Sequence, residues 1–433
     1  MRARPGMALG MAVGLLLGFS GASRAAGYGI YEQGAAVLGM AGAGAAAVSD
    51  ASAIFYNPGA LSRLDGAQLY LGGSLLTPVT SFAGADPYPG FGVTEKMKTQ
   101  FFPLPASYYA RRFGERWSGG LGISAPFGLG VDWEHPDTFT GRYIVTQAKL
   151  VDATAELAGS YAFTPEVSLG VGADLLFTKV HLENRILAPI PGGGGQQVDV
   201  AQAELDSDLK TAAGWNAGLS LAPTERWRFG ATYRGKIIAK PEGDATFRQI
   251  PSGDPTFDAA VAASLPPDQR IDTVLRFPAI WSAGAAWMPG EWTLAADAVF
   301  TEWSLFRDLP LNFQTTPSSS RTIVENYGDT WAFRAGAEHR LPAFTYRFGY
   351  YFEQEAAPTE SVSPLLPDAA RHGVTLGVGW AWGAHKQWKI DLYNLALFAE
   401  RRSTEGVNRD GFDGEYKTYV NSAGLNVGYH WSP

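Results

Sequence analysis

In several segments of the sequence, apolar residues alternate with small or polar ones, as they do in β-strands. Basic residues in these segments occupy positions next to aromatic and apolar residues. The five are Arg228, Arg234, Arg334, Arg347 and Lys389. Successive side chains of a strand point to opposite faces, so these cations would share the face away from their apolar neighbours. An arginine there can hold a carboxylate through two parallel hydrogen bonds, which suits a ligand with an acidic head group. Alternatively, these cations pair with acidic residues and form a polar lining. A shift of one residue in register would reverse these assignments.

The sequence carries no motif of an enzyme. It contains neither G-x-S-x-G nor H-E-x-x-H, and its six histidines are scattered without metal-ligand spacing. A glycine-rich run at Gly42 imitates a dinucleotide fingerprint, but no strand precedes it and no acidic residue follows at the required spacing. Cysteine is absent, which excludes disulfides and thiolate catalysis. We therefore expect no catalytic residue, metal or cofactor. A serine–histidine hydrolase whose residues meet only in the fold is the remaining enzyme hypothesis.

The composition fits a chain that faces both lipid and a polar interior. Charged residues make up 18% of the 433 residues and aromatic residues 13%, with 52 glycines. The mean hydropathy is near zero, which is too low for a bundle of membrane-spanning helices. A membrane β-barrel explains both values, because about half of its strand residues face lipid. The net charge of −8 argues against a nucleic-acid partner.

Short turns alternate with long loops from about residue 67 onward. The short turns are Gly114-Glu115-Arg116, Thr164-Pro165-Glu166, Pro223-Thr224-Glu225, Pro289-Gly290-Glu291, Leu341-Pro342-Ala343 and Gly383-Ala384-His385. Between them lie long stretches rich in proline, glycine, aspartate and serine. Tight turns on one side and long loops on the other are typical of bacterial outer-membrane barrels, where the turns are periplasmic. A soluble sandwich or propeller is the alternative, but it needs no such asymmetry.

Period-two alternation predicts about 14 strands. In one of them Leu169, Val171 and Leu175 share a face opposite Ser168, Asp174 and Thr178. Aromatic residues gather near strand ends, where the two membrane interfaces of a barrel would lie. An even number of strands lets the sheet close without an edge. The predicted strands are 67–82, 100–113, 116–127, 146–163, 166–186, 205–222, 225–247, 270–288, 291–305, 330–341, 343–354, 371–383, 386–402 and 414–431. We therefore predict an all-β fold, a transmembrane 14-stranded antiparallel barrel over residues 67–433.

The first 66 residues differ from the rest. A basic start, an apolar core and small residues at Ser23 and Ala25 predict a signal peptide over residues 1–25. The run of alanine and glycine that follows has too few large apolar side chains for a membrane helix, and Ser49 and Asp50 interrupt it. Small residues instead suit backbone packed closely against backbone. We expect residues 26–66 to form a compact plug, or hatch, in the lumen of the barrel.

One long loop carries a helix signal. Thr256 can cap a helix that Pro266 and Pro267 end. Phe257, Val261 and Leu265 then form an apolar stripe at spacings of four residues. The stripe either covers the rim of the barrel or forms an outer shelf for an apolar ligand.

Short motifs recur in order along the whole mature chain. They are Ala26-Gly27-Tyr28 with Glu32, Gly39 to Ser52, Asn57-Pro58, Pro126 to Leu129, Gly141-Arg142-Tyr143, Phe277-Pro278, Asp297, Trp303-Ser304, Trp331, and Leu366-Pro367-Asp368 with Arg371. Together these motifs resemble the FadL/TodX family of outer-membrane transporters of long-chain fatty acids and aromatic hydrocarbons. One departure is Gly59, where alanine is usual in the family.

The resemblance implies a 14-stranded barrel with an N-terminal hatch. It implies ligand capture at the outer loops, a tighter site near Ala26, Gly27 and Tyr28, and sideways exit at a kink in the third strand. The Asn57-Pro58 motif would lie against that kink. Gly119, Gly120 and Pro126 give the 116–127 strand a means to bend and to interrupt pairing.

These observations predict a protein of the bacterial outer membrane that passes long-chain fatty acids or similar hydrophobic small molecules without an energy source. An aromatic-hydrocarbon channel and a permanently plugged structural or adhesive barrel are the alternatives. We expect outer-membrane lipid, lipopolysaccharide and the barrel assembly machinery as partners, and a monomeric protein.

Overall fold

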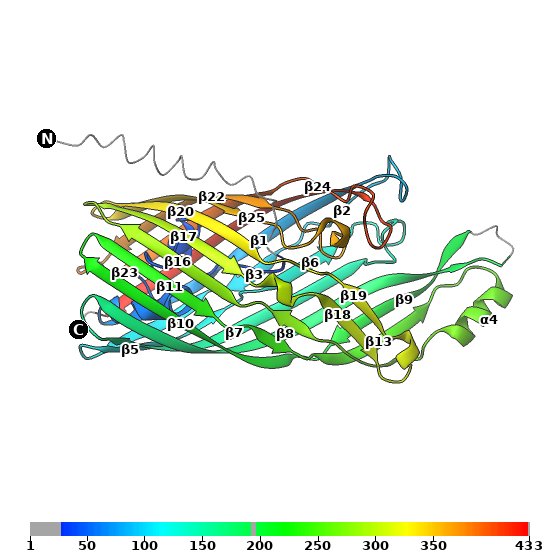
Figure 1. Ribbon diagram of the computed structural model, residues 1–433, viewed down its shortest axis with the longest axis horizontal. Coiled ribbons are helices and arrows are strands. Elements are labelled where there is room, and N and C mark those ends of the chain that lie inside the picture. The colour runs from blue at the N-terminus through cyan, green and yellow to red at the C-terminus, as the bar shows by residue number, and fades with distance from the viewer. Residues whose placement is uncertain (1–26, 192–195, 432–433) are drawn as a thin grey trace.

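The protein folds as a closed antiparallel barrel of 14 wall strands (Figure 1). The computed structural model describes residues 27–191 and 196–431, so the predicted signal peptide and Ala26 lie outside the described residues. The first and last strands pair along their whole length, from Ala67↔Trp431 to Gly84↔Gly414, which closes the wall. Short turns and the end of the last strand lie at the periplasmic end, and long loops lie at the outer end. The prediction of a 14-stranded barrel is confirmed.

The wall strands agree with the predicted ranges to within a few residues at most places. In order they are β1 (Ala67–Gly84), β3 and β4 (Phe102–Pro105, Ser107–Phe113), β5 and β6 (Trp117–Ser124, Gly128–Asp132), β7 (Gln147–Ala162), β8 (Val167–Pro189), β10 (Lys210–Thr224), β11 (Trp227–Arg234), β16 (Ile280–Trp287), β17 (Trp292–Thr301), β20 (Thr330–Arg340), β21 (Phe344–Glu353), β22 (Arg371–Trp382), β23 (Trp388–Ala399) and β25 (Gly414–Trp431).

Shorter elements extend the wall toward the outer side. The strands are β2 (Thr94–Lys96), β9 (Gln197–Ser207), β12 (Ile237–Ala239), β13 (Glu242–Gln249), β14 (Gln269–Asp272), β15 (Leu275–Phe277), β18 (Asp308–Phe313), β19 (Arg321–Val324) and β24 (Arg402–Ser403). The helices are α4 (Pro255–Ser264) and the 3-10 turns η2 (Trp303–Leu305), η3 (Pro317–Ser319) and η4 (Thr359–Ser361). The predicted 225–247 strand is broken, because β12 leaves the wall and pairs with β15 as a separate two-stranded sheet.

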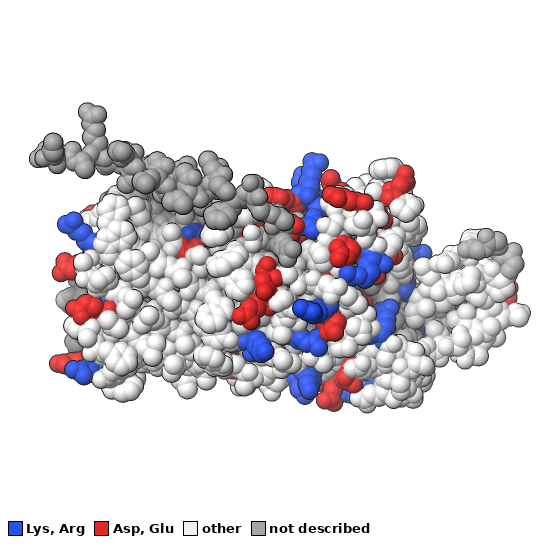
Figure 2. All heavy atoms as spheres, viewed as in Figure 1, with Lys and Arg blue, Asp and Glu red and all other residues white. Residues whose placement is uncertain are grey.

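The alternation of side chains follows the predicted faces. Val171 is 59% exposed on the outside of β8, whereas Asp174 is 3% exposed on the inside. On the face that Figure 2 shows, a region with few charges lies between the periplasmic rim and the charged outer part. Aromatic side chains line this region at both ends. Trp227 stacks on Trp287 near the periplasmic turns, and Tyr233 contacts Trp281 nearer the outer side. No helix among the described residues is long and apolar enough to cross a membrane.

Residues 27–66, which we call the lumenal segment, lie inside the barrel. They contain α2 (Ala35–Leu38), α3 (Ala53–Tyr56) and η1 (Pro58–Arg63), which contact wall strands around the barrel. Inward-facing glycines let the segment approach the wall. A Cβ on Gly230 would lie 1.8 Å from the carbonyl oxygen of Ala45, and one on Gly170 would lie 2.3 Å from the carbonyl carbon of Pro58. Side chains at these wall positions would therefore displace the segment.

Candidate ligand-binding site

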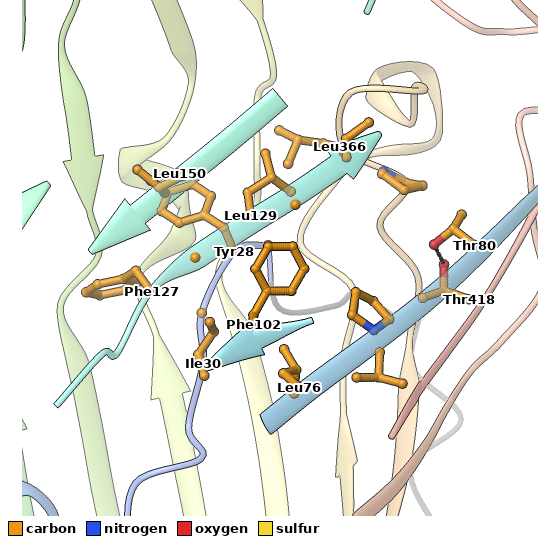
Figure 3. Close-up of a pocket in the computed structure, with 18 of the residues that line it drawn as sticks. Tyr28, Ile30, Leu76, Thr80, Phe102, Phe127, Leu129, Leu150, Leu366 and Thr418 are labelled. Atoms are coloured by element: carbon orange, nitrogen blue, oxygen red, sulfur yellow. Dashed lines mark hydrogen bonds between the residues drawn. The ribbon is translucent and has the colours of Figure 1, made fainter. Parts of the chain in front are cut away.

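An apolar cavity of about 330 Å³ lies at the start of the lumenal segment. The segment contributes Tyr28 and Ile30, and the wall contributes Leu76, Phe102, Phe127, Leu129 and Leu150. Figure 3 shows these side chains and Leu366, from an outer loop, around the same space. Four charged residues also line it: Glu32, Asp152, Asp368 and Arg371. A cavity of this size and polarity can hold the apolar part of a small ligand.

A kink in the third wall strand forms one side of the cavity. Strands β5 and β6 both pair with β7, but Ala125, Pro126 and Phe127 between them leave the ladder. Proline cannot donate a backbone hydrogen bond, so it favours such an interruption. The lumenal segment satisfies the freed backbone groups. Ile30 N–H donates to the carbonyl of Pro126 at 2.8 Å, and Gly128 N–H donates to the carbonyl of Tyr28 at 2.9 Å.

Gln33 completes the attachment at the kink. Its amide nitrogen donates to the carbonyl of Ala125 at 2.8 Å, and its amide oxygen accepts from Ala125 N–H at 3.3 Å. Gln33 is fully buried, so each of these bonds replaces a contact with water that the interior does not offer. The shape of the kink is therefore set by the lumenal segment as well as by the wall.

The kink leaves a gap in the wall beside the cavity. The β4–β5 ladder ends at Ser107↔Ile123, after which β3 pairs with β1 and β6 pairs with β7. Within the described residues no ladder joins β3 to β6, and contact resumes at the isolated bridge Met97↔Trp133. The ring of Phe102 lies across the gap, because a Cβ on Gly130 would be 1.9 Å from its Cζ. This ring also lines the cavity, so it separates the cavity from the gap.

Tyr28 fixes the start of the lumenal segment through aromatic contacts. Its ring centre lies 4.8 Å from that of Trp303 and 5.2 Å from that of Phe306, and its hydroxyl donates to the carbonyl of Arg276 at 2.6 Å. Gly27 adopts a positive φ of 53°, and a Cβ there would lie 2.9 Å from the Trp303 ring. Both residues were predicted site residues, and the structure places both of them in the cavity lining.

Arg371 is the cation of the cavity. Its guanidinium pairs with Glu353 at 2.9 Å and donates to the carbonyl of Gly29 at 3.4 Å, so it joins the wall to the lumenal segment. The sequence singled out Arg371 only within the family motif, not among the predicted ligand-binding residues. Its position at the start of β22, after the lining residues Leu366, Pro367 and Asp368, was the available signal.

The five predicted basic residues do not line this cavity. Arg234 pairs with Glu156 at 2.8 Å and Asp174 at 2.7 Å, and Arg347 pairs with Glu338 at 2.6 Å and Asp391 at 2.8 Å. Lys389 pairs with Asp391 at 3.0 Å. Arg334 donates to the carbonyl of Ala41 and lies 4.0 Å from the centre of the Tyr31 ring. No ion pair of Arg228 occurs in the described part of the chain. The geometry thus matches the alternative interpretation of these cations, a polar lining that holds the lumenal segment.

The predicted gate residues divide into two groups. Pro126 lies in the kink, whereas Gly119 and Gly120 belong to the regular β4–β5 ladder, where Gly120 leaves room for Ile54 of the lumenal segment. The expected position of Asn57-Pro58 needs correction. Asn57 donates to the carbonyls of Ala45 and Leu219, and Pro58 packs on Gly218 and Gly170 of β10 and β8. Gln33 and Ile30 make the hydrogen bonds to the kink instead.

The predicted apolar stripe of Phe257, Val261 and Leu265 lies far along the outer end, on α4 (Figure 1). Asp254, not Thr256, caps this helix, because its carboxylate accepts from Thr256 N–H at 2.8 Å. Phe257 and Val261 are buried against Val200, and Leu265 packs beside them. The stripe covers the β8–β9 hairpin, since an amphipathic helix buries its apolar face on the nearest apolar surface. It is not an open shelf.

Asp368 gives the cavity loop a pH dependence. The carboxylate accepts N–H bonds from Ala356 and Ala357, and burial raises the pKa of Asp368 from 3.8 to about 6. A raised pKa favours the neutral acid in the folded loop, so this contribution to stability is complete below pH 3.8 and is lost as the pH rises through about 6. Amide exchange at Ala356 and Ala357, corrected for its intrinsic rate, should therefore be better protected at pH 5 than at pH 7.5.

The Asp368→Asn variant should remove this difference, because asparagine stays neutral at both pH values. Asp86→Asn, in another outer loop, serves as the matched control and should leave it intact. Equal protection of the wild-type amides at the two pH values would contradict the assignment.

Comparisons with known proteins agree with this architecture. Residues 16–431 match the family model described as outer membrane protein transport protein (OMPP1/FadL/TodX). The chain is 22% identical to the long-chain fatty acid transport protein of Escherichia coli K12, with 89% of this chain and 90% of that protein covered. It is 24% identical to outer membrane protein P1 of Haemophilus influenzae, with 97% and 98% covered.

Two solved structures share the fold. A Pseudomonas aeruginosa FadL homologue superposes with a TM-score of 0.82 at 22% identity, over 94% of this chain and all of that chain. The Pseudomonas putida toluene transporter TodX superposes with a TM-score of 0.72 at 21% identity, over 93% of this chain and 99% of that chain.

Proposed function

The chain belongs to the OMPP1/FadL/TodX family of outer-membrane transport proteins, and we propose that it carries long-chain fatty acids, or similar hydrophobic small molecules, passively across the bacterial outer membrane. Members of this family are transport channels rather than enzymes. The finer assignments that follow are part of this proposal: a signal peptide over residues 1–25, a hatch over residues 26–66 and a barrel over residues 67–433.

The observation that carries the proposal is an apolar cavity with a single cation, next to a gap in the wall. Each methylene that enters the cavity from water gains about 0.8 kcal/mol, so an acyl chain is a suitable ligand. Arg371 can bind a carboxylate by donating two parallel N–H hydrogen bonds to it. The head group would lie where Arg371 meets Gly29, and the tail among Tyr28, Leu129 and Leu150.

We propose that ligand leaves sideways through the gap between β3 and β6. Phe102 has to turn away from Gly130, and the start of the lumenal segment has to separate from the kink. The ligand then passes from one apolar surrounding to another, which avoids exposing its tail to periplasmic water. The proposal includes no energy source. It also includes a monomeric protein, inserted by the barrel assembly machinery and surrounded by outer-membrane lipid and lipopolysaccharide.

Neutral aromatic hydrocarbons are the second candidate ligands. Three acidic residues line the cavity against one arginine: Glu32, Asp152 and Asp368. Arg371 is also already paired with Glu353. This balance disfavours an anion and favours a neutral ligand, unless the carboxylate displaces part of that pairing.

Neutralising Arg371 separates these candidates. In Arg371→Gln, oleate binding to the purified barrel should weaken by about 10- to 100-fold, because a hydrogen bond to a charged group contributes about 1.5–3 kcal/mol. Toluene binding should be unchanged. Tryptophan quenching or calorimetry measures both ligands.

Arg228→Gln is the matched control, since Arg228 does not line the cavity. The double variant Arg371→Gln/Glu353→Gln also removes the carboxylate that Arg371 pairs with, and it should still bind oleate weakly. Binding of toluene but not oleate by the wild type would assign the protein to hydrocarbon uptake. Binding of neither would favour the permanently plugged barrel.

A further inference from the structure

A notch on the outer surface of the barrel, separate from the ligand cavity, lies at the periplasmic end of the seam between β25, β1 and β4. Ala67 pairs with Trp431 on one side and with Arg111 on the other, so the three side chains form one row on one face. Tyr109 stands in the next row on β4, opposite Leu69. The small side chain of Ala67 lies between two large ones in a groove of about 580 Å³, which Gly66, Arg112 and Gly114 also line at the periplasmic rim. We call these four residues the Arg111 notch: Ala67, Tyr109, Arg111 and Trp431.

The notch faces the membrane rather than the lumen. Tyr108 and Ala110 are buried on the inner face of β4, so Tyr109, Arg111 and Phe113 point outward. Phe113 is 56% exposed and Trp117, its partner on β5, is 60% exposed. Trp431 is 43% exposed at the same rim. These exposed rings belong to the aromatic belt, which marks the depth of the lipid head groups in the periplasmic leaflet.

Hydrogen-bond donors in the notch have no protein acceptor. Within residues 27–191 and 196–431, no hydrogen bond or ion pair is formed by the Arg111 guanidinium, the Tyr109 hydroxyl or the Trp431 indole N–H. Arg111 lies 5.7 Å from the centre of the Phe113 ring, and no carboxylate of residues 27–191 and 196–431 pairs with it. The neighbouring Arg112 forms an ion pair with Asp65 and donates hydrogen bonds to the carbonyls of Gly114 and Glu115.

The position of Arg111 on the barrel also differs from that of the other cations near the periplasmic end. Among the described strands, it is the only lysine or arginine on the outward face close to the periplasmic turns. Other cations at this end either point inward, as Lys389 does, or lie in turns, as Arg116 does. A guanidinium facing lipid without a counterion is unfavourable, and an anion at head-group depth would remove that cost.

We propose that the Arg111 notch binds the phosphate of an anionic phospholipid of the periplasmic leaflet. The planar guanidinium matches the oxygen atoms of a phosphate through parallel N–H donors. The Tyr109 hydroxyl and the Trp431 indole can supply further donors, and Ala67 gives the head group room. The acyl chains would then lie along the apolar outer surfaces of β1 and β4.

Native mass spectrometry of the purified barrel, titrated with dioleoylphosphatidylglycerol, tests the proposal. The wild type should retain one tightly bound lipid, and Arg111→Gln should weaken that binding by about tenfold or more. Arg116→Gln should bind like the wild type. Ala67→Leu, which fills the notch without changing charge, should also weaken binding, whereas Ala231→Leu, at another exposed outward position on β11, should not.

Folding of each variant is checked by its resistance to unfolding in cold detergent. Equal retention of phosphatidylglycerol by the wild type and Arg111→Gln would overturn the proposal. Occupation of the notch by oleate or inorganic phosphate as tightly as by phosphatidylglycerol would overturn the assignment to a phospholipid. The proposal does not depend on the ligand of the cavity, so either can fail alone.

Discussion

Oxidation of a Gly29→Cys/Phe127→Cys variant should stop the uptake of long-chain fatty acid, and reduction should restore it. Gly29 and Phe127 form an isolated antiparallel bridge between the lumenal segment and the kink. Residues opposite each other in such a bridge lie within reach of a disulfide. The disulfide would hold the start of the segment against β6 and keep the cavity closed. If exit through the gap requires this segment to move, uptake should fall at least about tenfold.

The chain contains no cysteine, so the introduced pair is the only one that can form. Uptake of labelled oleate is measured in cells that depend on this transporter, with oxidant and then with reductant. The reduced variant controls for loss of the Phe127 ring. Ala231→Cys/Ala283→Cys, which joins two outward residues paired in the wall, is the matched disulfide control. Equal uptake by the oxidised and reduced Gly29→Cys/Phe127→Cys variant would contradict exit beside the kink.

The barrel could be predicted from sequence because the alternation of outward and inward side chains can be read within each strand alone. Val374, Leu376 and Val378 alternate with small residues, and all three are exposed on the outside of β22. One face of each strand meets lipid, so a period of two fixes the direction of each side chain without knowledge of its neighbours. The number of strands follows from the turns between them.

The cavity could not be predicted in the same way, because it depends on contacts between distant strands. The sequence showed that Arg347 points inward, but not that Glu338, 9 residues away, and Asp391, 44 residues away, both reach it. Arg371 differs from Arg347 only in its neighbours, which place it beside apolar side chains. The tertiary structure shows which carboxylates each inward cation meets: Glu338 and Asp391 for Arg347, and Glu353 for Arg371.

The kink shows the same limit. Pro126 indicated an interruption of the strand, but Gln33, which bonds to the freed backbone of Ala125, lies 92 residues before Ala125. Asn57, which the family motif had placed there, bonds to Leu219, 162 residues away. On α4 the spacing of Phe257 and Val261 predicted an apolar stripe that either covers the rim or binds ligand, and no local pattern says that it covers the β8–β9 hairpin.

Replacing Arg347 with methionine should destabilise the barrel far more than the same replacement of an exposed arginine. Its side chain is 1% exposed and lies between the carboxylates of Glu338 and Asp391, which are 7% and 0% exposed. Arg347→Met leaves Glu338 with Arg340 and Asp391 with Lys389 as their remaining cations, and breaking a buried pair typically costs about 3–5 kcal/mol. The variant should also weaken the packing of the lumenal segment, because the Tyr70 hydroxyl donates to Asp391 and accepts from Ala36 N–H of that segment. Urea unfolding of the reconstituted barrel, followed by tryptophan fluorescence, measures the change in the free energy of unfolding.

Arg270→Met is the matched control, because Arg270 also contacts two carboxylates, Asp208 at 2.7 Å and Asp244 at 3.1 Å, but at an exposed site. Water and salt screen exposed pairs, so this variant should unfold almost like the wild type. The triple variant Glu338→Gln/Arg347→Met/Asp391→Asn removes the three buried charges together, whereas the side chains of Arg340 and Lys389 are 48% and 33% exposed and can be hydrated. This variant should recover most of the stability, since the cost lies in the buried carboxylates that lose Arg347. A loss in Arg347→Met no greater than in Arg270→Met would mean that water reaches the pair from the lumen. In that case the lumenal segment would not seal the barrel. A ligand could then pass straight through the lumen, and the argument for a sideways route would fail.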